Sequence, residues 1–236
     1  MNAPDSREQE IIRSWHSNAA PWSEAIRTAS IASRKLVTNQ AIIDAVSSVS
    51  PSRVLDIGCG EGWLARALSA LGMNVTGVDI VPELITQAVA SSGTTPGSTT
   101  FLVQDYESIA SRRWRSGLFD AAVCNFSLLG LESVDSLIAA VPSYLEQSGH
   151  LLIQTLHPVA VCGAEPYQDG WREGSWQGFS GKFRDPGPWY FRTLESWSAL
   201  LERCGFDILE CREPRAAGAV TPASVICIGK RREREG

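Results

Sequence analysis

VLDIGCGEGW, residues 54–63, is an apolar run that passes into three alternating glycines. Glycine at alternate positions lets the backbone turn tightly and come close to a ligand. The segment that follows has the three-and-four spacing of an amphipathic helix, in Leu64, Ala65, Ala67, Leu68 and Leu71. Strand, glycine loop and helix in this order predict a nucleotide-binding loop with the helix N-terminus directed at the ligand. Glycines after a strand also occur as simple turn residues, so the loop alone leaves both interpretations open.

A carboxylate ends the next β-rich segment, residues 74–79. Asp79 lies 19 residues after Gly60, near the roughly 20-residue spacing at which nucleotide-binding folds place an acid on a ribose. Asp79 is also suited to cap a helix that begins at Pro82. The two roles are compatible, and the second matched feature favours ligand binding over a simple turn.

Two residues distinguish this loop from the dinucleotide pattern G-x-G-x-x-G. The third small residue of that pattern falls at Trp63, where an indole blocks close helix–strand packing. Asp56 stands two residues before the first glycine. A carboxylate there repels a pyrophosphate but fits a ligand that carries an ammonium group. The sequence therefore disfavours a nicotinamide-dependent oxidoreductase.

The motifs resemble those of the class I S-adenosylmethionine (SAM) dependent methyltransferases, over roughly residues 40–155. Residues 54–62 are similar to the first motif of that family, 77–79 to its ribose-binding acid and 104–106 to its adenine-binding acid, and Asn125 to the residue that ends its fourth strand. The resemblance implies SAM as the cofactor, with Asp79 accepting from the ribose hydroxyls and Asp105 from the adenine amino group. Asn125 is expected at the methionine end. The other positions expected at the cofactor are Asp56, Gly58, Cys59, Gly60, Gly62, Ile80, Tyr106 and Phe126.

Strand-like and helix-like periodicity alternate along the chain. Candidate strands span 53–57, 74–79, 99–104, 118–125, 150–156, 206–212 and 224–229, and one of the intervening helices is predicted over 134–146, with Gly149 as its terminator. Alternation of this kind predicts a parallel sheet covered on both faces. The last two strands are separated only by residues 213–223, too few for a crossover helix, so we expect an antiparallel hairpin. The fold class is α/β: a doubly wound, mainly parallel seven-stranded sheet with an antiparallel terminal hairpin. The resemblance implies the same Rossmann-like fold, with a reversed strand at the edge of the sheet.

Residues 1–49 are predicted to form an N-terminal helical cap, and residues 50–236 the SAM-binding α/β core. Residues 157–192 form a long insertion in that core, rich in aromatic residues, glycine and proline, before a helix that Thr193 is expected to cap. Ordered loops of this length are commonly lids or binding loops. A satellite core of aromatic rings is the alternative interpretation, and it stays open. The candidate substrate residues in the insertion are Trp171, Trp176, Trp189 and Tyr190.

Histidine supplies the candidates for proton transfer. His157 follows the fifth predicted strand, where ligands bind in doubly wound sheets, and its unperturbed pKa near 6.5 suits a general base. A histidine that only bonds a neighbouring backbone group explains the position equally well. His16 is a weaker second candidate, because N-terminal helices of similar enzymes fold over the cofactor. His150 begins a strand at the opposite edge and is expected to be a bystander.

Composition limits the kinds of partner that this protein is expected to bind. A formal net charge of −5 and a sequence pI near 5.3 argue against a nucleic-acid partner, which needs a basic stripe. Arginine and lysine near the C-terminus alternate with Glu233 and Glu235, which predicts a solvated tail. No segment has the apolar length of a membrane helix, and the first residues lack the features of a signal peptide. The six cysteines contain no C-x-x-C pair, so we expect reduced, buried thiols in a cytoplasmic protein and no metal site.

The sequence thus favours an enzyme that moves a methyl group from SAM to an oxygen or nitrogen of a small molecule. Tryptophans and tyrosines in the insertion favour an aromatic or heteroaromatic acceptor. A SAM-binding accessory or regulatory protein without catalysis is the alternative, because cofactor binding and methyl transfer use different groups.

Overall fold

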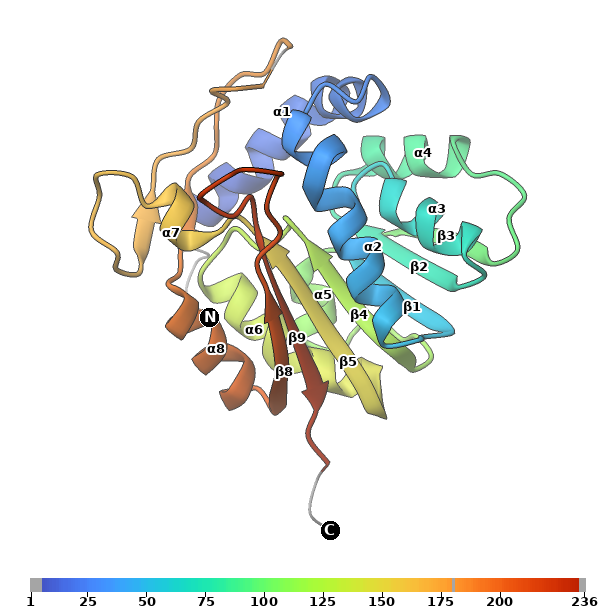
Figure 1. Cartoon of the computed structure of the whole chain (residues 1–236). Helices are drawn as coiled ribbons and strands as arrows, with labels where there is room; N and C mark the ends of the chain where they lie inside the picture. The colour runs from blue at the N-terminus through green and yellow to red at the C-terminus, as the bar shows by residue number, and fades with distance from the viewer. Residues whose placement is uncertain (1–5, 180, 234–236) are drawn as a thin grey trace.

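One seven-stranded sheet organises the chain in the computed structural model, which describes residues 6–179 and 181–233 (Figure 1). Its strands run in the order β3-β2-β1-β4-β5-β9-β8. They are β1 Arg53–Ile57, β2 Asn74–Asp79, β3 Ser98–Val103, β4 Phe119–Asn125, β5 Leu145–Thr155, β8 Phe206–Arg212 and β9 Val225–Arg231. The first five pair in parallel, and β9 is antiparallel to both β5 and β8. The predicted sheet and hairpin are confirmed, but the reversed strand β9 lies inside the sheet and β8 forms the edge.

Helices cover both faces of the sheet. On one face lie α2 Asn39–Ser48, α3 Trp63–Ala70 and α4 Pro82–Ala90, which contribute Ile42, Leu68 and Ala88 to a buried cluster. On the other lie α5 Tyr106–Ala110, α6 Glu132–Ala140 and α8 Leu194–Arg203. Thr193 caps α8 as expected, because its side chain accepts from the backbone N–H of Ser196. Although α2 belongs to the segment predicted as a cap, it packs in the core of the sheet.

The helix predicted over 134–146 is wrong in its second half. Helix α6 ends at Ala140, a 3₁₀ turn, η2, covers Val141–Tyr144, and β5 already begins at Leu145. Pro142 lies in that turn, and proline lacks the N–H that a continuing α-helix needs. The register between β4 and β5 shifts between Phe119 and Ala121, so the first part of β5 is irregular.

Helix α1, Ser6–Arg27, lies beside the insertion over the carboxyl ends of the parallel strands (Figure 1). The insertion contains α7 Pro158–Val161 and a small hairpin of β6 Gly170–Arg172 and β7 Trp189–Phe191. A five-residue π-helix, η1 Arg34–Thr38, leads from the α1 side into α2. These elements form a roof over the end of the sheet at which doubly wound folds bind ligands.

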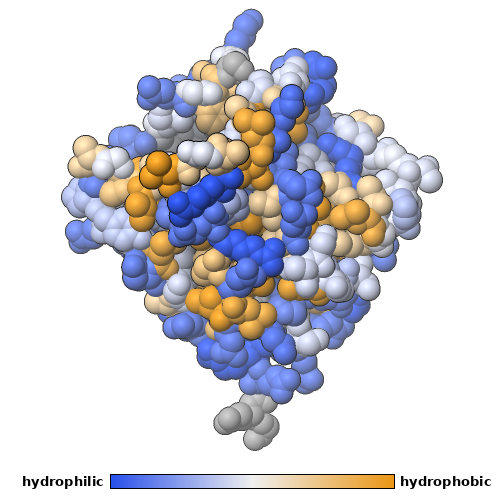
Figure 2. Space-filling model, viewed as in Figure 1, coloured by the Kyte–Doolittle hydropathy of each residue, from blue (hydrophilic) through white to orange (hydrophobic). Residues whose placement is uncertain are grey.

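The basic C-terminal segment is more ordered than predicted. Lys230 and Arg231 belong to β9, and Arg232 donates to the carboxylate of Asp207 and to the Phe206 carbonyl. The prediction of a solvated tail is therefore wrong for Lys230 and Arg231, whereas Arg232 is exposed as predicted. Arg234 and Glu235 lie outside the described residues. No helix among the described residues is long and apolar enough to cross a membrane. On the face shown in Figure 2, hydrophobic side chains gather in several separate patches.

Candidate active site

Asp79 ties the glycine loop to the end of β2. One carboxylate oxygen accepts from the Gly60 N–H at 2.9 Å and the other from the Val81 N–H at 2.9 Å. Burial raises the pKa of Asp79, while the hydrogen bonds from Val81 and Gly60 oppose that rise. The carboxylate lies at the carboxyl edge of the sheet, where the sequence predicts a ribose.

The glycines of the loop have different surroundings, although Gly58, Gly60 and Gly62 all have positive φ. A Cβ on Gly58 would meet the Ser127 Cβ at 2.3 Å, whereas a Cβ on Gly60 would meet only the Trp22 indole nitrogen, at 3.5 Å. Gly58 thus makes room for a neighbouring loop of the protein. Gly60 is the glycine that faces α1, beside the Trp22 indole.

The remaining positions of the predicted cofactor site have mixed roles. Tyr106 lies beneath Gly58 and donates to the Ser127 carbonyl at 3.0 Å, and burial raises the pKa of its phenol. Asp105 caps α5 by accepting from the Ser108 N–H at 2.7 Å. Buried Cys59 and Gly62 support the loop from within, and Ile80 packs beside Trp15 and Trp22 of α1.

Phe126 directly follows β4 and has φ of 55°. This left-handed conformation is unfavourable for a bulky residue and is enriched at functional sites. The Phe126 N–H donates to the Gln154 carbonyl at 2.8 Å, and its ring lines the cavity described below. The strained turn therefore serves to present this ring to the cavity.

Several buried polar atoms at this edge have no hydrogen-bond partner, among them Asp56 Oδ2, Asn125 Oδ1 and Arg34 Nη2. Thr38 Oγ1, Glu61 Oε2 and Gln154 Oε1 are also without a partner. Burial, followed by the charges of Asp79 and Glu61, raises the pKa of Asp56 to about 8. A buried polar atom without a partner is costly and calls for a specific explanation. Asp56 and Asn125 provide two acceptors and Arg34 provides one cationic donor. A ligand with one ammonium group and one carboxylate needs partners of these kinds.

Arg34 is a site residue that the sequence reasoning missed. It is 8% exposed, and its guanidinium lies 5.4 Å from the Trp22 ring and 4.7 Å from the Trp63 ring. Burial lowers its pKa to about 10, against the opposing charge of Glu61. Its Nε donates to Asn39 Oδ1 at 3.1 Å, which leaves Nη2 as the unpartnered donor. The position of Trp63 after the loop was the one available signal, because tryptophan faces attract guanidinium groups.

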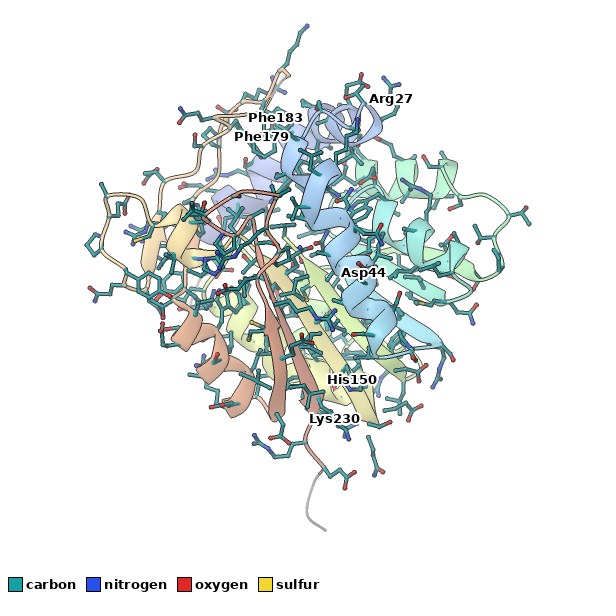
Figure 3. All side chains as sticks on the ribbon, viewed as in Figure 1. Arg27, Asp44, His150, Phe179, Phe183 and Lys230 are labelled. Atoms are coloured by element: carbon teal, nitrogen blue, oxygen red, sulfur yellow. The ribbon has the colours of Figure 1, made fainter. Side chains whose placement is uncertain are left out.

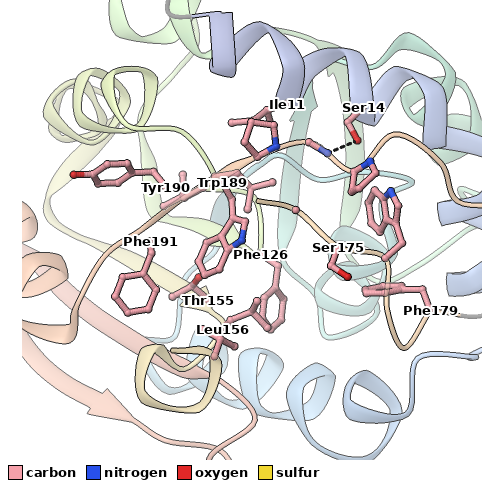
Figure 4. Close-up of a pocket in the computed structure, with 18 of the residues that line it drawn as sticks. Ile11, Ser14, Phe126, Thr155, Leu156, Ser175, Phe179, Trp189, Tyr190 and Phe191 are labelled. Atoms are coloured by element: carbon pink, nitrogen blue, oxygen red, sulfur yellow. Dashed lines mark hydrogen bonds between the residues drawn. The ribbon is translucent and has the colours of Figure 1, made fainter. Parts of the chain in front are cut away.

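A cavity of about 240 Å³ lies under the roof. Figure 4 shows Trp189 at its centre, with Phe126, Thr155 and Leu156 below and Ile11 and Ser14 of α1 above. Its aromatic lining is Trp15, Trp22, Phe126, Trp176, Phe179, Trp189, Tyr190, Phe191 and Trp197. Apolar, mainly aromatic walls with few polar groups are typical of small-molecule sites.

Two buried side chains of α1 hold the insertion in place. Asn18 donates to the Arg184 carbonyl at 2.7 Å and accepts from the Arg184 N–H at 3.0 Å, and Ser14 accepts from the Gly187 N–H at 3.0 Å (Figure 4). The rings of Trp15 and Trp176 add an edge-to-face contact at 5.9 Å. Packing among the aromatics and lining of the cavity thus occur together, and a role of the insertion in holding the substrate stays a prediction.

The four candidate substrate residues do not all line the cavity. Trp176, Trp189 and Tyr190 line the cavity, whereas Trp171 is not among its lining residues. Trp171 stacks edge-to-face on Tyr190 at 5.6 Å and lies under the Arg7 guanidinium at 5.5 Å. It supports the hairpin from the outside.

The histidines lie apart from one another. His157 is 3% exposed, and its Nε2 lies 3.1 Å from Glu213 Oε1. Its neighbours Leu156 and Pro158 line the cavity, but His157 is not among the lining residues, and its Nδ1 is buried without a partner. His16 is exposed, with Nδ1 3.9 Å from Glu83 of α4, on the side of Asp79.

His150 pairs with Lys230 across β5 and β9, at the end of the sheet opposite Phe179 and Phe183 (Figure 3). Its position fits the expected bystander. Within residues 6–179 and 181–233, no group of three or more His, Cys, Asp or Glu side chains is arranged to hold a metal ion.

Comparison with known proteins agrees with this geometry. A family model described as "Methyltransferase domain" matches residues 31–211. The ubiquinone biosynthesis O-methyltransferase of Xanthomonas axonopodis pv. citri (strain 306) is 35% identical over 120 residues, which cover 48% of this chain and 49% of the relative. The chain therefore spans about half the length of the curated relatives that it matches.

Solved structures share the fold. A SAM-dependent methyltransferase from Mesorhizobium loti has a TM-score of 0.58 at 23% identity and covers 80% of this chain and 96% of its own. The magnesium protoporphyrin IX methyltransferase of Synechocystis PCC 6803, solved with bound SAH, has a TM-score of 0.54 at 17% identity, over 98% and 90% of the two chains. The solved structures show that the protein shares the fold of SAM-dependent methyltransferases. The family match over most of the chain shows that it belongs to the methyltransferase domain family.

Proposed function

We propose that this enzyme methylates an oxygen or nitrogen atom of a small aromatic molecule that binds under the roof. The observation that carries the proposal is the aromatic cavity at the carboxyl ends of β4 and β5. Planar acceptors gain favourable ring contacts from walls of this kind. Oxygen is the favoured atom, because the curated relative named above is a ubiquinone biosynthesis O-methyltransferase.

The unpartnered polar atoms fit SAM. In our proposal Asp56 and Asn125 accept from the α-ammonium group of its methionine part, and Arg34 donates to the α-carboxylate. Asp79 accepts from the ribose hydroxyls, and Asp105 from the adenine amino group. Gly60 allows the close approach of the backbone beside Trp22.

SAM supplies an electrophilic methyl group on a sulfonium, and the task of the chain is to hold the acceptor in line with it. Phe126 and Trp189 form walls that orient a flat acceptor, and the roof of α1 and the insertion covers it. Alignment of this kind supplies on the order of 7–11 kcal/mol in the best intramolecular cases.

His157 remains the proposed general base. A proton on Nε2 directed at Glu213 leaves Nδ1 as the proton acceptor, the arrangement by which a carboxylate orients a catalytic imidazole. The ring is covered in this conformation, so the role requires residues on the Nδ1 side of the ring to move when the acceptor binds, while Glu213 keeps its contact with Nε2. A histidine that only anchors the loop of residues 213–223 is the competing interpretation.

Two tryptophan variants test the acceptor site. The enzyme is supplied with SAM and a panel of hydroxylated aromatics and their amino analogues, and S-adenosylhomocysteine and product mass are measured. Trp189→Ala should raise the acceptor KM about tenfold or more, because loss of a large apolar contact costs roughly 1.5–3 kcal/mol, with SAM affinity little changed. Trp171→Ala should have a smaller effect, because its ring lies outside the cavity.

Equal effects of the two variants would contradict the cavity as the acceptor site. Unmodified acceptors throughout the panel, at normal SAM affinity, would contradict the proposed acceptor class. Preferential methylation of the amines would select nitrogen over oxygen.

A further inference from the structure

Two of the six cysteines face each other across the terminal hairpin. Cys211 of β8 is in register with Cys227 of β9, and the two sulfurs lie 3.5 Å apart within hydrogen-bonding distance. Both are free thiols in this structure. Nothing in methyl transfer or cofactor binding, as derived above, uses either residue.

The backbone already has the spacing of a disulfide. Directly opposed residues of antiparallel strands have Cα atoms about 4.5–5.5 Å apart, inside the range of about 4.4–6.8 Å that disulfides require. A bond forms when the sulfurs approach by about 1.5 Å from their present 3.5 Å. Side-chain rotation supplies a movement of this size without a change of strand register.

The two thiols have complementary environments. Cys211 is exposed at the edge of the sheet, whereas Cys227 is 3% exposed. The hydrogen bond with Cys227 lowers the pKa of Cys211 to about 7, although burial and the charges of Glu210 and Glu213 oppose this. The same hydrogen bond and burial raise the pKa of Cys227. Cys211 is thus the accessible attacking thiol, and Cys227 the resolving thiol beneath it.

We propose that Cys211 and Cys227 form a modification site that takes a low-molecular-weight disulfide such as glutathione disulfide and converts it into an internal, reversible disulfide. In the first step the Cys211 thiolate attacks one sulfur of the small disulfide, its S–S bond breaks, and one glutathione leaves as thiolate. In the second step Cys227 loses its proton to solvent and attacks Cys211, and the second glutathione leaves. The two protein thiols are oxidised and one glutathione disulfide is reduced to two thiols.

The site lies at the base of the loop that closes one side of the acceptor cavity. Glu213, two residues after Cys211, holds His157, and Ala223 lines the cavity. Ser224 accepts from the Gln154 amide at 2.9 Å. A bond between 211 and 227 closes the chain on both sides of residues 213–223 and restricts the motion of that loop.

The first experiment uses the full chain without substitution. The reduced protein is incubated with glutathione disulfide near pH 7 and quenched with acid, and its peptides are mapped by mass. We expect a peptide pair joined through Cys211 and Cys227, reversed by dithiothreitol, and slower hydrogen exchange over residues 213–223 in the oxidised protein. Cys211 should react faster than a thiol of ordinary pKa, because its larger thiolate fraction outweighs its lower nucleophilicity.

Single variants separate the two steps. Cys227→Ser should leave Cys211 as a trapped mixed disulfide, Cys211→Ser should prevent both products, and Cys204→Ser, at a half-buried thiol whose pKa burial raises, should behave like the unsubstituted protein. The proposal is overturned if the peptide map joins other cysteines or none, if the Cys227→Ser protein carries no adduct at Cys211, or if exchange in residues 213–223 is the same in both redox states.

Discussion

Arg34→Met tests whether the buried guanidinium of Arg34 binds the cofactor or stabilises the fold. Burial lowers the pKa of Arg34 from its ordinary 12.5 to about 10, which corresponds to about 3 kcal/mol of destabilisation of the charged form in the folded, ligand-free protein. The contacts with Asn39, Trp22 and Trp63 offset part of this. Methionine has a similar length and no charge to desolvate. The free energy of unfolding of the ligand-free variant should therefore be unchanged or higher, by up to about 3 kcal/mol.

The affinity for SAM should change in the opposite direction. Removing one partner of a buried charge pair costs about 2 kcal/mol or more, so the Kd of Arg34→Met for SAM should rise at least about 30-fold. A SAM analogue without its carboxylate completes a double-mutant cycle, because it should bind the two proteins with nearly equal affinity.

The assay combines titration calorimetry with SAM and the analogue and urea unfolding of the ligand-free proteins. Arg66→Met is the matched control, since Arg66 pairs with Glu61 at 3.2 Å but is not among the residues that line the cavity. An unchanged Kd for SAM, or an equal loss of affinity for SAM and the analogue, would refute the carboxylate assignment. A loss of more than about 2 kcal/mol of stability would show that Arg34 is structural.

The remaining predictions concern proton equilibria. The pKa of Asp56 is about 8 in the folded protein, against an ordinary 3.8. Between about pH 4 and 8 the folded protein therefore keeps a proton on Asp56 that the unfolded chain has lost. The stability of the ligand-free protein should fall as pH rises through that window. SAM affinity should rise over the upper part of the same window, because the ionised carboxylate holds the ammonium group, and calorimetry of Asp56→Asn should show neither dependence. His157→Ala should lower the methyl-transfer rate about 100-fold at neutral pH, with a deficit that shrinks as pH rises and the acceptor ionises by itself. A deficit that is constant across pH would assign His157 to the anchoring of residues 213–223, and Glu213→Gln would then reproduce it.

Local sequence determined the bounds of several strands and the position of the glycine loop. Strands β1, β2 and β8 have the bounds that the sequence pattern predicts, although β1 is a continuous buried run and β8 is mostly exposed. The loop of alternate glycines and the acid of β2 are short-range features, so motif spacing located Gly60 and Asp79 before any contact was known. The second half of the helix predicted over 134–146 was wrong. Pro142 signals the end of a helix, but the prediction gave more weight to the apolar pattern.

Tertiary structure decided the contacts between segments distant in the chain. Arg34 becomes a buried donor only because Trp22 and Trp63 meet around it, and Trp171 and Trp189 differ in role only because a hairpin has two faces. His157 is directed toward Glu213 by the return of a loop 56 residues later. Cys211 and Cys227 become a pair through strand register. Sequence patterns record which residues are apolar or helical, whereas burial, register and side-chain direction arise from packing among all the elements at once.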